Sequence, residues 1–328
     1  MNRRTLLKHT GLLAAGAVGL PAFRATVSEE FAAGIKNAGY FCSQLGEMEL
    51  LVVTDGHGMF KPAQPMFAPG IPTVDFEAIL QQNFLPPGVV DIAFNVLVIK
   101  KGKDIILFDT GCGANFGPQS GRLPDNLRAA GIDPAEVTAI LLTHAHPDHV
   151  GGMLDKEGHP VFPHAAVYVA ALEYDFWTSG KPDFSKSRYT DHTATAFWVA
   201  LATKGFAAYR DRLHIFHDGD RLMEGIRARV VPGHTPGHTL FTISSGEETI
   251  VHMGDTAHDH VVLLSHPEWG VGFDTDFEEA AQARRKILGE LAAGRQRIFS
   301  CHLPWPGLGH IRARDKGYEW VEQAFATV

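Results

Sequence analysis

The chain has 328 residues, of which 45% are hydrophobic and 20% are charged, and its formal net charge is −8 at neutral pH. This composition supplies enough apolar surface for a folded core and excludes a disordered or fibrous protein. The acidic balance disfavours nucleic acid as a partner, because contacts with phosphates depend on clustered Lys and Arg.

Residues 1–25 resemble an export signal of the twin-arginine type. Arg3 and Arg4 precede a Leu/Ala/Gly-rich stretch that contains no acidic residue. The apolar stretch falls short of the roughly 20 residues that a bilayer span needs. We therefore expect a cleaved signal without stable membrane insertion, and a periplasmic or secreted mature protein. Cleavage would remove four basic residues and no acid, which changes the formal net charge from −8 to −12.

Residues 26–45 are expected to form an N-terminal extension and residues 46–328 a single domain. Short β-branched and aliphatic runs predict strands at 49–55, 94–100, 104–111, 138–144, 165–170, 226–234, 239–244, 248–255 and 297–302. Helical periodicity predicts helices at 75–82, 123–130, 170–177, 193–202, 276–292 and 315–326. No linker or repeat divides these elements, so we expect one α/β domain of two sheets with helices outside.

The three cysteines, Cys42, Cys112 and Cys301, form no CxxC pair. Their number and spacing imply no disulfide framework, even in an exported protein. We expect Cys301, which stands beside His302, to be a packed strand residue and Cys112 to be a turn residue, because nothing in the sequence supplies the base that a nucleophilic thiol needs.

The segment THAHPDHVGG, residues 143–152, places three histidines and an aspartate directly after a predicted strand. His144 and His146 lie two positions apart in extended chain, so their side chains can point the same way. A proline then turns the chain, so that Asp148 and His149 converge from the other side. Imidazole and carboxylate suit zinc and its first-row neighbours, and four such groups in six residues could serve two ions.

Three further residues of metal-binding type stand where a predicted strand ends and a loop begins: His234, Asp255 and His302. If these strands reach the site in one direction, all seven side chains gather along one edge. Two divalent ions bring +4, Asp148 and Asp255 bring −2, and a bridging hydroxide brings −1. The loaded site is then near +1, which favours an oxyanion that develops during hydrolysis.

These ordered motifs resemble the metallo-β-lactamase-fold hydrolase superfamily. The resemblance implies a four-layer αβ/βα sandwich and two divalent metal ions, with zinc favoured and Mn²⁺, Co²⁺ or Fe²⁺ as alternatives. It assigns His144, His146 and His234 to one ion, Asp148, His149 and His302 to the second, and Asp255 to the bridge between them. Hydrolysis by a metal-held hydroxide is implied, with Asp148 and Asp255 as the catalytic candidates for proton transfer.

A closer resemblance, to the methyl parathion hydrolase group, covers about residues 46–321. It rests on the segments FGPQSGRLPDNLRAAGI, THAHPDHVGGM, GHTPGHT and HLPWPGLGHIRARDKGY. Members of that group hydrolyse organophosphate triesters and, in several cases, aryl esters and lactones, and aromatic side chains line their leaving-group pocket. The matching positions here are Phe116, Trp177 and Phe197, with Trp198 as the alternative to Phe197.

One departure concerns substrate choice. Lactonases of the superfamily usually carry a Tyr three residues after the bridging Asp, where this chain has His258. His258 is expected either to replace that Tyr as a polar group at the substrate or to be an exposed loop residue.

The sequence therefore predicts an exported dinuclear-metal hydrolase of a small-molecule ester, either an organophosphate triester or an aryl ester. The alternatives are a lactonase or carboxylic esterase of the same superfamily and a metal-binding protein without catalysis. A β-lactamase is disfavoured, because those enzymes mostly lack the bridging Asp. Relatives in the group are commonly dimers, so a homodimer is expected.

Overall fold

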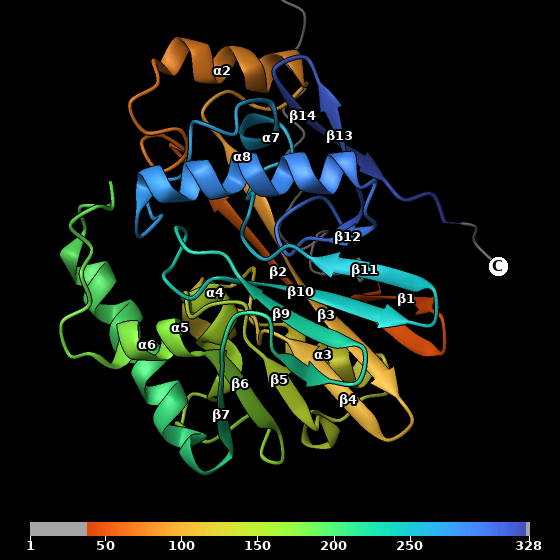
Figure 1. Ribbon diagram of the computed structural model, residues 1–328. Coiled ribbons are helices and arrows are strands. Elements are labelled where there is room, and N and C mark those ends of the chain that lie inside the picture. Colours follow the sequence, from red (N-terminus) through yellow and green to blue (C-terminus); the bar gives the residue numbers. More distant parts are fainter. Residues whose placement is uncertain (1–37, 326–328) are drawn as a thin grey trace, which may run out of the picture. The chain divides into compact units, whose positions relative to one another are not determined.

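The computed structural model describes residues 38–325 (Figure 1). The predicted signal, residues 1–25, and most of the predicted extension lie outside the described residues. None of the described helices is long and apolar enough to cross a membrane.

The first sheet contains seven strands that lie side by side in chain order. Neighbours are antiparallel from β1 to β4 and parallel from β4 to β7. The strands are β1 (Tyr40–Leu45), β2 (Met48–Phe60), β3 (Val90–Lys101), β4 (Asp104–Phe108), β5 (Ala139–Leu141), β6 (Ala166–Ala170) and β7 (Leu213–Phe216). The last six residues of the predicted extension thus form β1, which pairs with β2.

The second sheet also contains seven strands, again in chain order. All neighbours are antiparallel except β11 and β12. The strands are β8 (Arg221–Met223), β9 (Ile226–Val230), β10 (Thr239–Ser245), β11 (Glu248–His252), β12 (Ile298–Phe299), β13 (Leu308–Arg314) and β14 (Gly317–Glu322).

The two sheets pack face to face through a buried apolar core. Phe108 of the first sheet and Phe241 of the second meet edge to face, with ring centroids 5.3 Å apart. Leu97 and Phe299 are completely buried in the same layer. The alternation of apolar residues in β3, β4 and β10 supplies this layer, because every second side chain of a strand faces the same side.

Helices cover the outer face of each sheet (Figure 1). Buried residues of α3 (Leu123–Ala129), α5 (Ala171–Thr178) and α6 (His192–Ala208) share one core with the first sheet. Those of α2 (Thr73–Gln82), α7 (Val262–Ser265) and α8 (Phe277–Ala293) share another with the second sheet. This arrangement confirms the predicted four-layer sandwich.

One predicted helix is wrong. Residues 315–326 were expected to be helical, but β13 and β14 form an antiparallel hairpin that turns at Asp315 and Lys316. Asp315 has a φ of 50°, the left-handed conformation that tight turns use. The chain there alternates with a period of two, since Tyr318 and Trp320 lie opposite Ala313 and Ile311. The helix-forming Glu and Ala residues nearby obscured that alternation.

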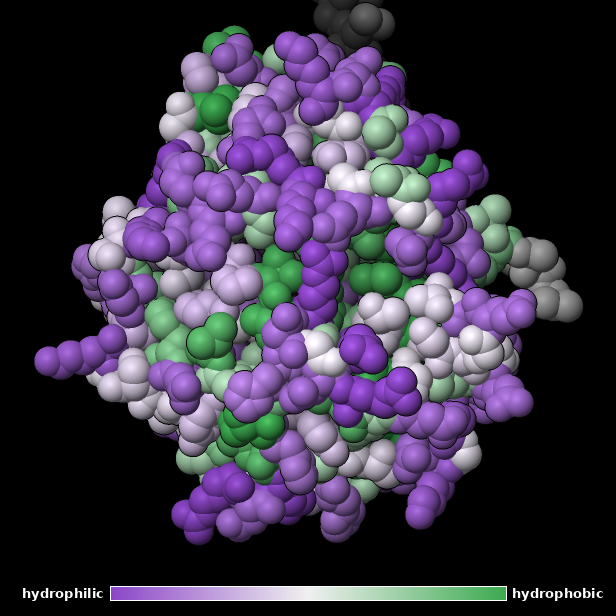
Figure 2. Space-filling view, viewed as in Figure 1, coloured by the Kyte–Doolittle hydropathy of each residue, from purple (hydrophilic) through white to green (hydrophobic). Residues whose placement is uncertain are grey.

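The face of the molecule seen in Figure 2 is mostly hydrophilic, with hydrophobic side chains in hollows. One groove lies between α8 and the outer face of β10 and β11. Leu240, Val251 and Ile287 line it together with Arg229 and Glu290, which form an ion pair of 2.6 Å across it.

Candidate metal centre

All seven side chains predicted to bind metal lie together at the ends of strands. His144 follows β5, and His146 precedes α4 (Pro147–Val150), which carries Asp148 and His149. His234 follows β9, Asp255 follows β11 and His302 follows β12. Pro147 begins α4 with no backbone N–H to satisfy, and the extended conformation of His146 turns its ring toward the other histidines.

The first group of side chains contains three imidazoles. Nε2 of His144 lies 3.1 Å from Nδ1 of His146 and 3.1 Å from Nε2 of His234. Nδ1 of His146 lies 2.9 Å from Nε2 of His234. Three nitrogens bound to one tetrahedral zinc ion at 2.0–2.1 Å would be about 3.4 Å apart. The three rings are therefore arranged as ligands of one ion.

The second group lies beside the first and contains more carboxylate. Nε2 of His149 lies 3.6 Å from Oδ2 of Asp148 and 3.3 Å from Oδ1 of Asp255. Nε2 of His302 lies 3.5 Å from Oδ2 of Asp148 and 3.1 Å from Oδ2 of Asp255. Oδ2 of Asp255 is also 3.3 Å from Nε2 of His234. Asp255 thus stands between the two groups.

The outer hydrogen bonds of the histidines test whether the site fits a metal. Nδ1 of His149 lies 2.8 Å from Oδ2 of Asp109, and Nδ1 of His302 lies 2.9 Å from the carbonyl of Ala93. Because these oxygens accept only, each Nδ1 carries a proton, which leaves Nε2 of each ring as the atom that faces the site and could bind a metal. Nε2 of His149 is buried and has no hydrogen-bond partner within residues 38–325. These groups fit a divalent cation.

Two rings of the first group, His144 and His146, differ in their electrostatics from the rings of the second. Burial lowers the pKa of His144 and His146 well below the usual value, so both rings are neutral, the form that binds metal. Burial acts the same way on His149, but neighbouring carboxylates, Asp255 first, raise its pKa well above the usual value. Against the same burial, Asp255 raises the pKa of His302 to about 9. The second group thus lies in a field that favours positive charge.

Asp109 orients His149 from the end of β4. It is buried, and its carboxylate accepts hydrogen bonds of 2.8 Å from both the backbone N–H and the hydroxyl of Thr143. Its φ of 68° is the left-handed conformation, uncommon for a residue other than glycine. Such strain is found where the surroundings fix a functional side chain.

Asp274 orients His234 in the same manner. Its Oδ1 lies 2.7 Å from Nδ1 of His234, and its Oδ2 accepts from Arg284 of α8 at 3.0 Å. Burial opposes ionisation of Asp274, but Arg284 and His234 outweigh it and lower the pKa to about 2. The ionised carboxylate therefore keeps the proton of His234 on Nδ1.

Two more residues hold Asp255. Nε2 of His238 accepts the backbone N–H of Asp255 at 2.9 Å, so His238 supports the centre from outside the seven proposed ligands. The thiol of Cys301 lies 3.1 Å from Oδ1 of Asp255. Cys301 was expected to be an ordinary packed residue, so the sequence did not reveal this contact.

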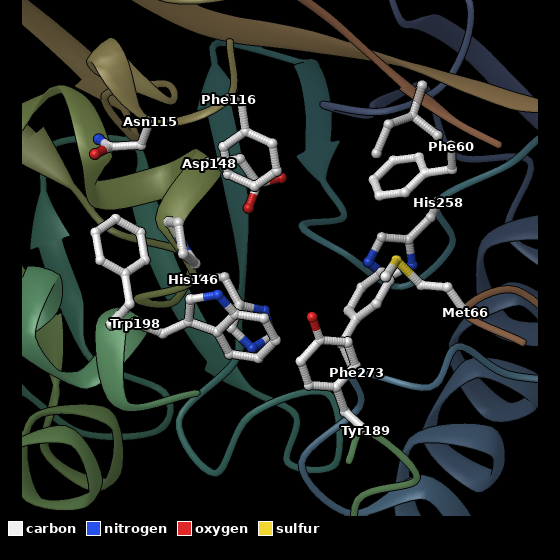
Figure 3. Close-up of a pocket in the computed structure, with 13 residues that line it drawn as sticks. Phe60, Met66, Asn115, Phe116, His146, Asp148, Tyr189, Trp198, His258 and Phe273 are labelled. Carbon is white, nitrogen blue, oxygen red and sulfur yellow. The ribbon is translucent and has the colours of Figure 1, made fainter. Parts of the chain in front are cut away.

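A cavity of about 300 Å³ opens onto the centre (Figure 3). His146, Asp148 and His258 reach it from the metal side, and Asn115 lies at one margin. The rest of the wall is apolar or aromatic and comes from Phe60, Met66, Ile92, Phe116, Pro147, Tyr189, Phe197, Trp198 and Phe273. No Lys or Arg among residues 38–325 lines it.

The structure places three of the four predicted substrate-binding residues in this wall: Phe116, Phe197 and His258. The predicted place of Trp177 in the pocket wall is wrong. It is completely buried and lies behind His146, with ring centroids 5.8 Å apart. Its indole N–H donates to Glu173, one turn earlier in α5, and this bond holds the ring on the buried side of the helix. Trp198 of α6 lines the cavity instead, stacked on Tyr189 at 4.9 Å.

A match to a family model decides the family. Residues 93–316 match the model of the metallo-beta-lactamase superfamily, a range that includes all seven predicted ligands. The chain belongs to this superfamily. As a member with this constellation of histidines and aspartates, it is a metal-dependent hydrolase.

Solved structures in this superfamily are similar over most of the chain. AidC, a dizinc quorum-quenching lactonase solved with a homoserine product, is 36% identical over 88% of this chain and 99% of its own, with a TM-score of 0.84. The hydrolase AbOPH is 32% identical over 89% of this chain and 100% of its own, with a TM-score of 0.81. The probable metallo-hydrolase YybB of Bacillus subtilis is 26% identical over 50% of this chain, and the match spans only 63% of YybB.

Proposed function

We propose that the protein hydrolyses an uncharged, largely apolar carboxylic ester, with a lactone as the preferred form. The observation that carries the proposal is the cavity wall, in which aromatic and aliphatic side chains surround a few polar groups at the metal side. Such a wall binds apolar groups through burial and stacking. It offers no cation to an anionic substrate, so it disfavours β-lactams, which carry a carboxylate, and phosphodiesters.

In this proposal His144, His146 and His234 hold one ion, Asp148, His149 and His302 hold a second, and Asp255 contacts both. When bound, two divalent ions activate a water molecule and stabilise negative charge on the substrate oxygen. The chain's part is to orient the imidazoles, through Asp109 and Asp274, and to exclude bulk water with the aromatic wall.

Asp148 is the carboxylate best placed to move a proton. It lines the cavity, with 13% of its side chain exposed, so it can reach a bound substrate. Asp255 is 2% exposed and is surrounded by His234, His302 and Cys301. We therefore assign proton transfer at the leaving group to Asp148 and a holding role to Asp255.

His258 is the polar group proposed to contact the scissile bond. It is buried at the cavity wall, which excludes the exposed-loop alternative. Its ring stacks on His302 at 5.2 Å. Its Nε2 lies 3.0 Å from Oδ2 of Asp255, whereas Nδ1 is buried without a hydrogen-bond partner among the described residues. Nδ1, the ring nitrogen that Asp255 does not engage, can hydrogen-bond to a bound substrate at this place.

The preference for a lactone is supported by the likeness to AidC, which covers nearly the full length of both chains. An organophosphate triester is the second candidate. It is favoured by the segments shared with the methyl parathion hydrolase group and by Phe116, Phe197 and Trp198, which could hold an aryl leaving group. Two further proposals rest on the sequence alone: export directed by residues 1–25, and assembly of the protein as a homodimer.

The test compares kcat/KM of the zinc-loaded protein for N-hexanoyl homoserine lactone, an aryl hexanoate and a dialkyl aryl phosphotriester with the same aryl group. We expect the lactone to lead by at least tenfold, about 1.4 kcal/mol of transition-state stabilisation. A phosphotriester that led by the same factor would overturn the lactone preference. An aryl ester that carries a carboxylate on its acyl chain, hydrolysed as fast as its neutral counterpart, would contradict the selection for uncharged substrates.

A further inference from the structure

Two loops far apart in the chain supply the three imidazoles of the first group. His144 and His146 belong to the loop after β5, whereas His234 belongs to the loop between β9 and β10. Their ring nitrogens nevertheless lie within 3.1 Å of one another. One direct hydrogen bond joins the two segments at the strand ends, from the backbone N–H of Thr239 to the carbonyl of Thr143 at 2.8 Å. A second connection, through a side chain of α5, lies closer to the ligands themselves.

Glu173, in the first turn of α5, contacts both loops. It is completely buried. Its Oε1 accepts the backbone N–H of Ala145, between the two histidines, at 2.7 Å. Its Oε2 accepts the hydroxyl of Thr235 at 2.6 Å and the backbone N–H of Gly237 at 2.9 Å, just after His234.

We propose that Glu173 is a positioning residue that sets the separation of these two loops, and thereby the geometry and affinity of the first metal site. The inference rests on the proposed assignment of His144, His146 and His234 to one ion. It adds a residue that the ligand motifs do not contain and that touches neither the ion nor the substrate.

Each carboxylate oxygen of Glu173 accepts from one loop, Oε1 from the loop of His144 and Oε2 from the loop of His234. Oε1 also accepts from the indole of Trp177 at 2.7 Å, so both oxygens are fully engaged and neither is free to bind metal. The second loop packs directly on α5, because a Cβ at Gly237 would lie 2.3 Å from the backbone nitrogen of Glu173. This close packing therefore fixes both the distance and the direction in which the loop of His234 lies against α5.

This division predicts an unusual sensitivity to Glu173→Gln. A glutamine keeps the size of the side chain but has one acceptor oxygen, and its NH₂ group would face the donors of one loop. It can hold the loop of His144 or the loop of His234, but not both. We expect the affinity of the first site to fall by about 10- to 100-fold, the range found for partners that orient metal ligands.

The experiment measures metal affinity rather than activity. Metal-free protein is titrated with Co²⁺, followed by visible absorption and by metal content after dialysis. Each site is isolated with a ligand variant: His302→Ala leaves the first site, and His234→Ala leaves the second. Glu173→Gln should weaken Co²⁺ binding in the His302→Ala background and leave it unchanged in the His234→Ala background. Equal weakening in both would indicate general destabilisation and would overturn the proposal.

Asp55→Asn is the matched control. Asp55 is also completely buried and accepts three backbone N–H groups, from Cys112, Gly121 and Leu123, but none of these residues belongs to the two loops that carry the first group. The Asp55→Asn variant should have a lower melting temperature, without a selective loss of Co²⁺ affinity at one of the two sites. If Glu173→Gln does not fold, Thr235→Val removes one donor and keeps the carboxylate, and it should weaken the same site by a smaller factor.

The outcomes separate this inference from the proposed function. Two ions in the wild type with undiminished affinity in Glu173→Gln would overturn the role of Glu173 alone. A wild type that bound no Co²⁺ would overturn the proposed metal centre and this role with it.

Discussion

Cys301 makes the most informative single-residue contact outside the seven proposed ligands. Its thiol lies 3.1 Å from Oδ1 of Asp255, while Oδ2 of that aspartate faces His234 and His302. The thiol donor therefore holds the oxygen that turns away from the first group. Asp255 can then present a single oxygen, Oδ2, toward both groups.

The variant Cys301→Ala removes that donor and should leave Asp255 free to rotate. We expect a loss of about tenfold in metal affinity or kcat, at the low end of the range for such partners. Cys301→Ser, which keeps a donor, should restore most of it. Metal content after dialysis and kcat of both variants provide the check, and an alanine variant equal to the wild type would show that the contact is incidental.

His258→Phe tests the polar group at the substrate. The phenyl ring can keep the packing against His302 and Phe273, whose rings lie 5.2 and 5.0 Å from that of His258, but it offers no N–H. We expect kcat to fall about 100-fold, as for removal of a donor to a developing oxyanion. Metal content should not change. An unaltered kcat would mean that His258 makes no important contact with the reacting group of the substrate.

Residue type and local spacing explain why the ligands were predictable and their partners were not. His144, His146, Asp148 and His149 lie within six positions, so the sequence itself brings them together. Asp109 and Asp274 each lie 40 positions from the ligand that they orient, and Glu173 bonds to loop residues 28 and 62 positions away. In sequence each resembles any surface acid, and only the packing of helices on sheets buries it.

At the scale of elements, α8 connects the second sheet to the metal centre. Arg284 extends from it to Asp274, and Asp274 holds His234. The helix begins at Asp276, whose side chain accepts the backbone N–H of Glu279 at 3.1 Å and lies beside Lys186. The stability of the first turn of α8 thus bears on the position of a proposed ligand.

Asp276→Ala removes this N-cap. We expect a loss of about 1 kcal/mol in the free energy of unfolding, and Asp276→Ser should recover most of it because serine also caps helices. Urea denaturation of the three proteins measures the difference. Alanine and serine variants of equal stability would show that the ion pair with Lys186, rather than the cap, accounts for the effect of Asp276.

The rotation of α5 about its axis explains why the prediction that Trp177 lines the pocket is wrong. The resemblance proposed Trp177 and Phe197, with Trp198 as the alternative to Phe197, as aromatic residues of the pocket. Which aromatic side chains face the cavity depends on how α5 and α6 rotate against the first sheet. In α5 the indole of Trp177 bonds to Glu173, one turn earlier, and is buried with it. In α6 Trp198 and Phe197 face the cavity. Aromatic content alone does not distinguish these orientations.

At the scale of the whole described chain, the centre joins the two halves of the sandwich. His144, His146, Asp148 and His149 follow a strand of the first sheet, whereas His234, Asp255 and His302 follow strands of the second. Each proposed ion takes ligands from both sheets. Metal binding is thereby coupled to the packing of one sheet against the other.

Removal of metal with a chelator should accordingly lower the melting temperature. Free metal at 1,000 times its dissociation constant adds about 4 kcal/mol per site to the stability of the folded protein. Calorimetry of the chelated and zinc-replete protein measures the change, and the His302→Ala variant should show a smaller one. A melting temperature independent of zinc would mean that the sandwich packs without help from the centre.

The order of the proposed ligands along the chain determines when the centre can form during translation. The three imidazoles of the first group are complete once residue 234 has been made, but the second group needs His302 out of 328 residues. A nascent or truncated chain that ends before β12 can retain one ion at most. Occupancy of the second site therefore distinguishes chains whose synthesis passed β12 from those that stopped short.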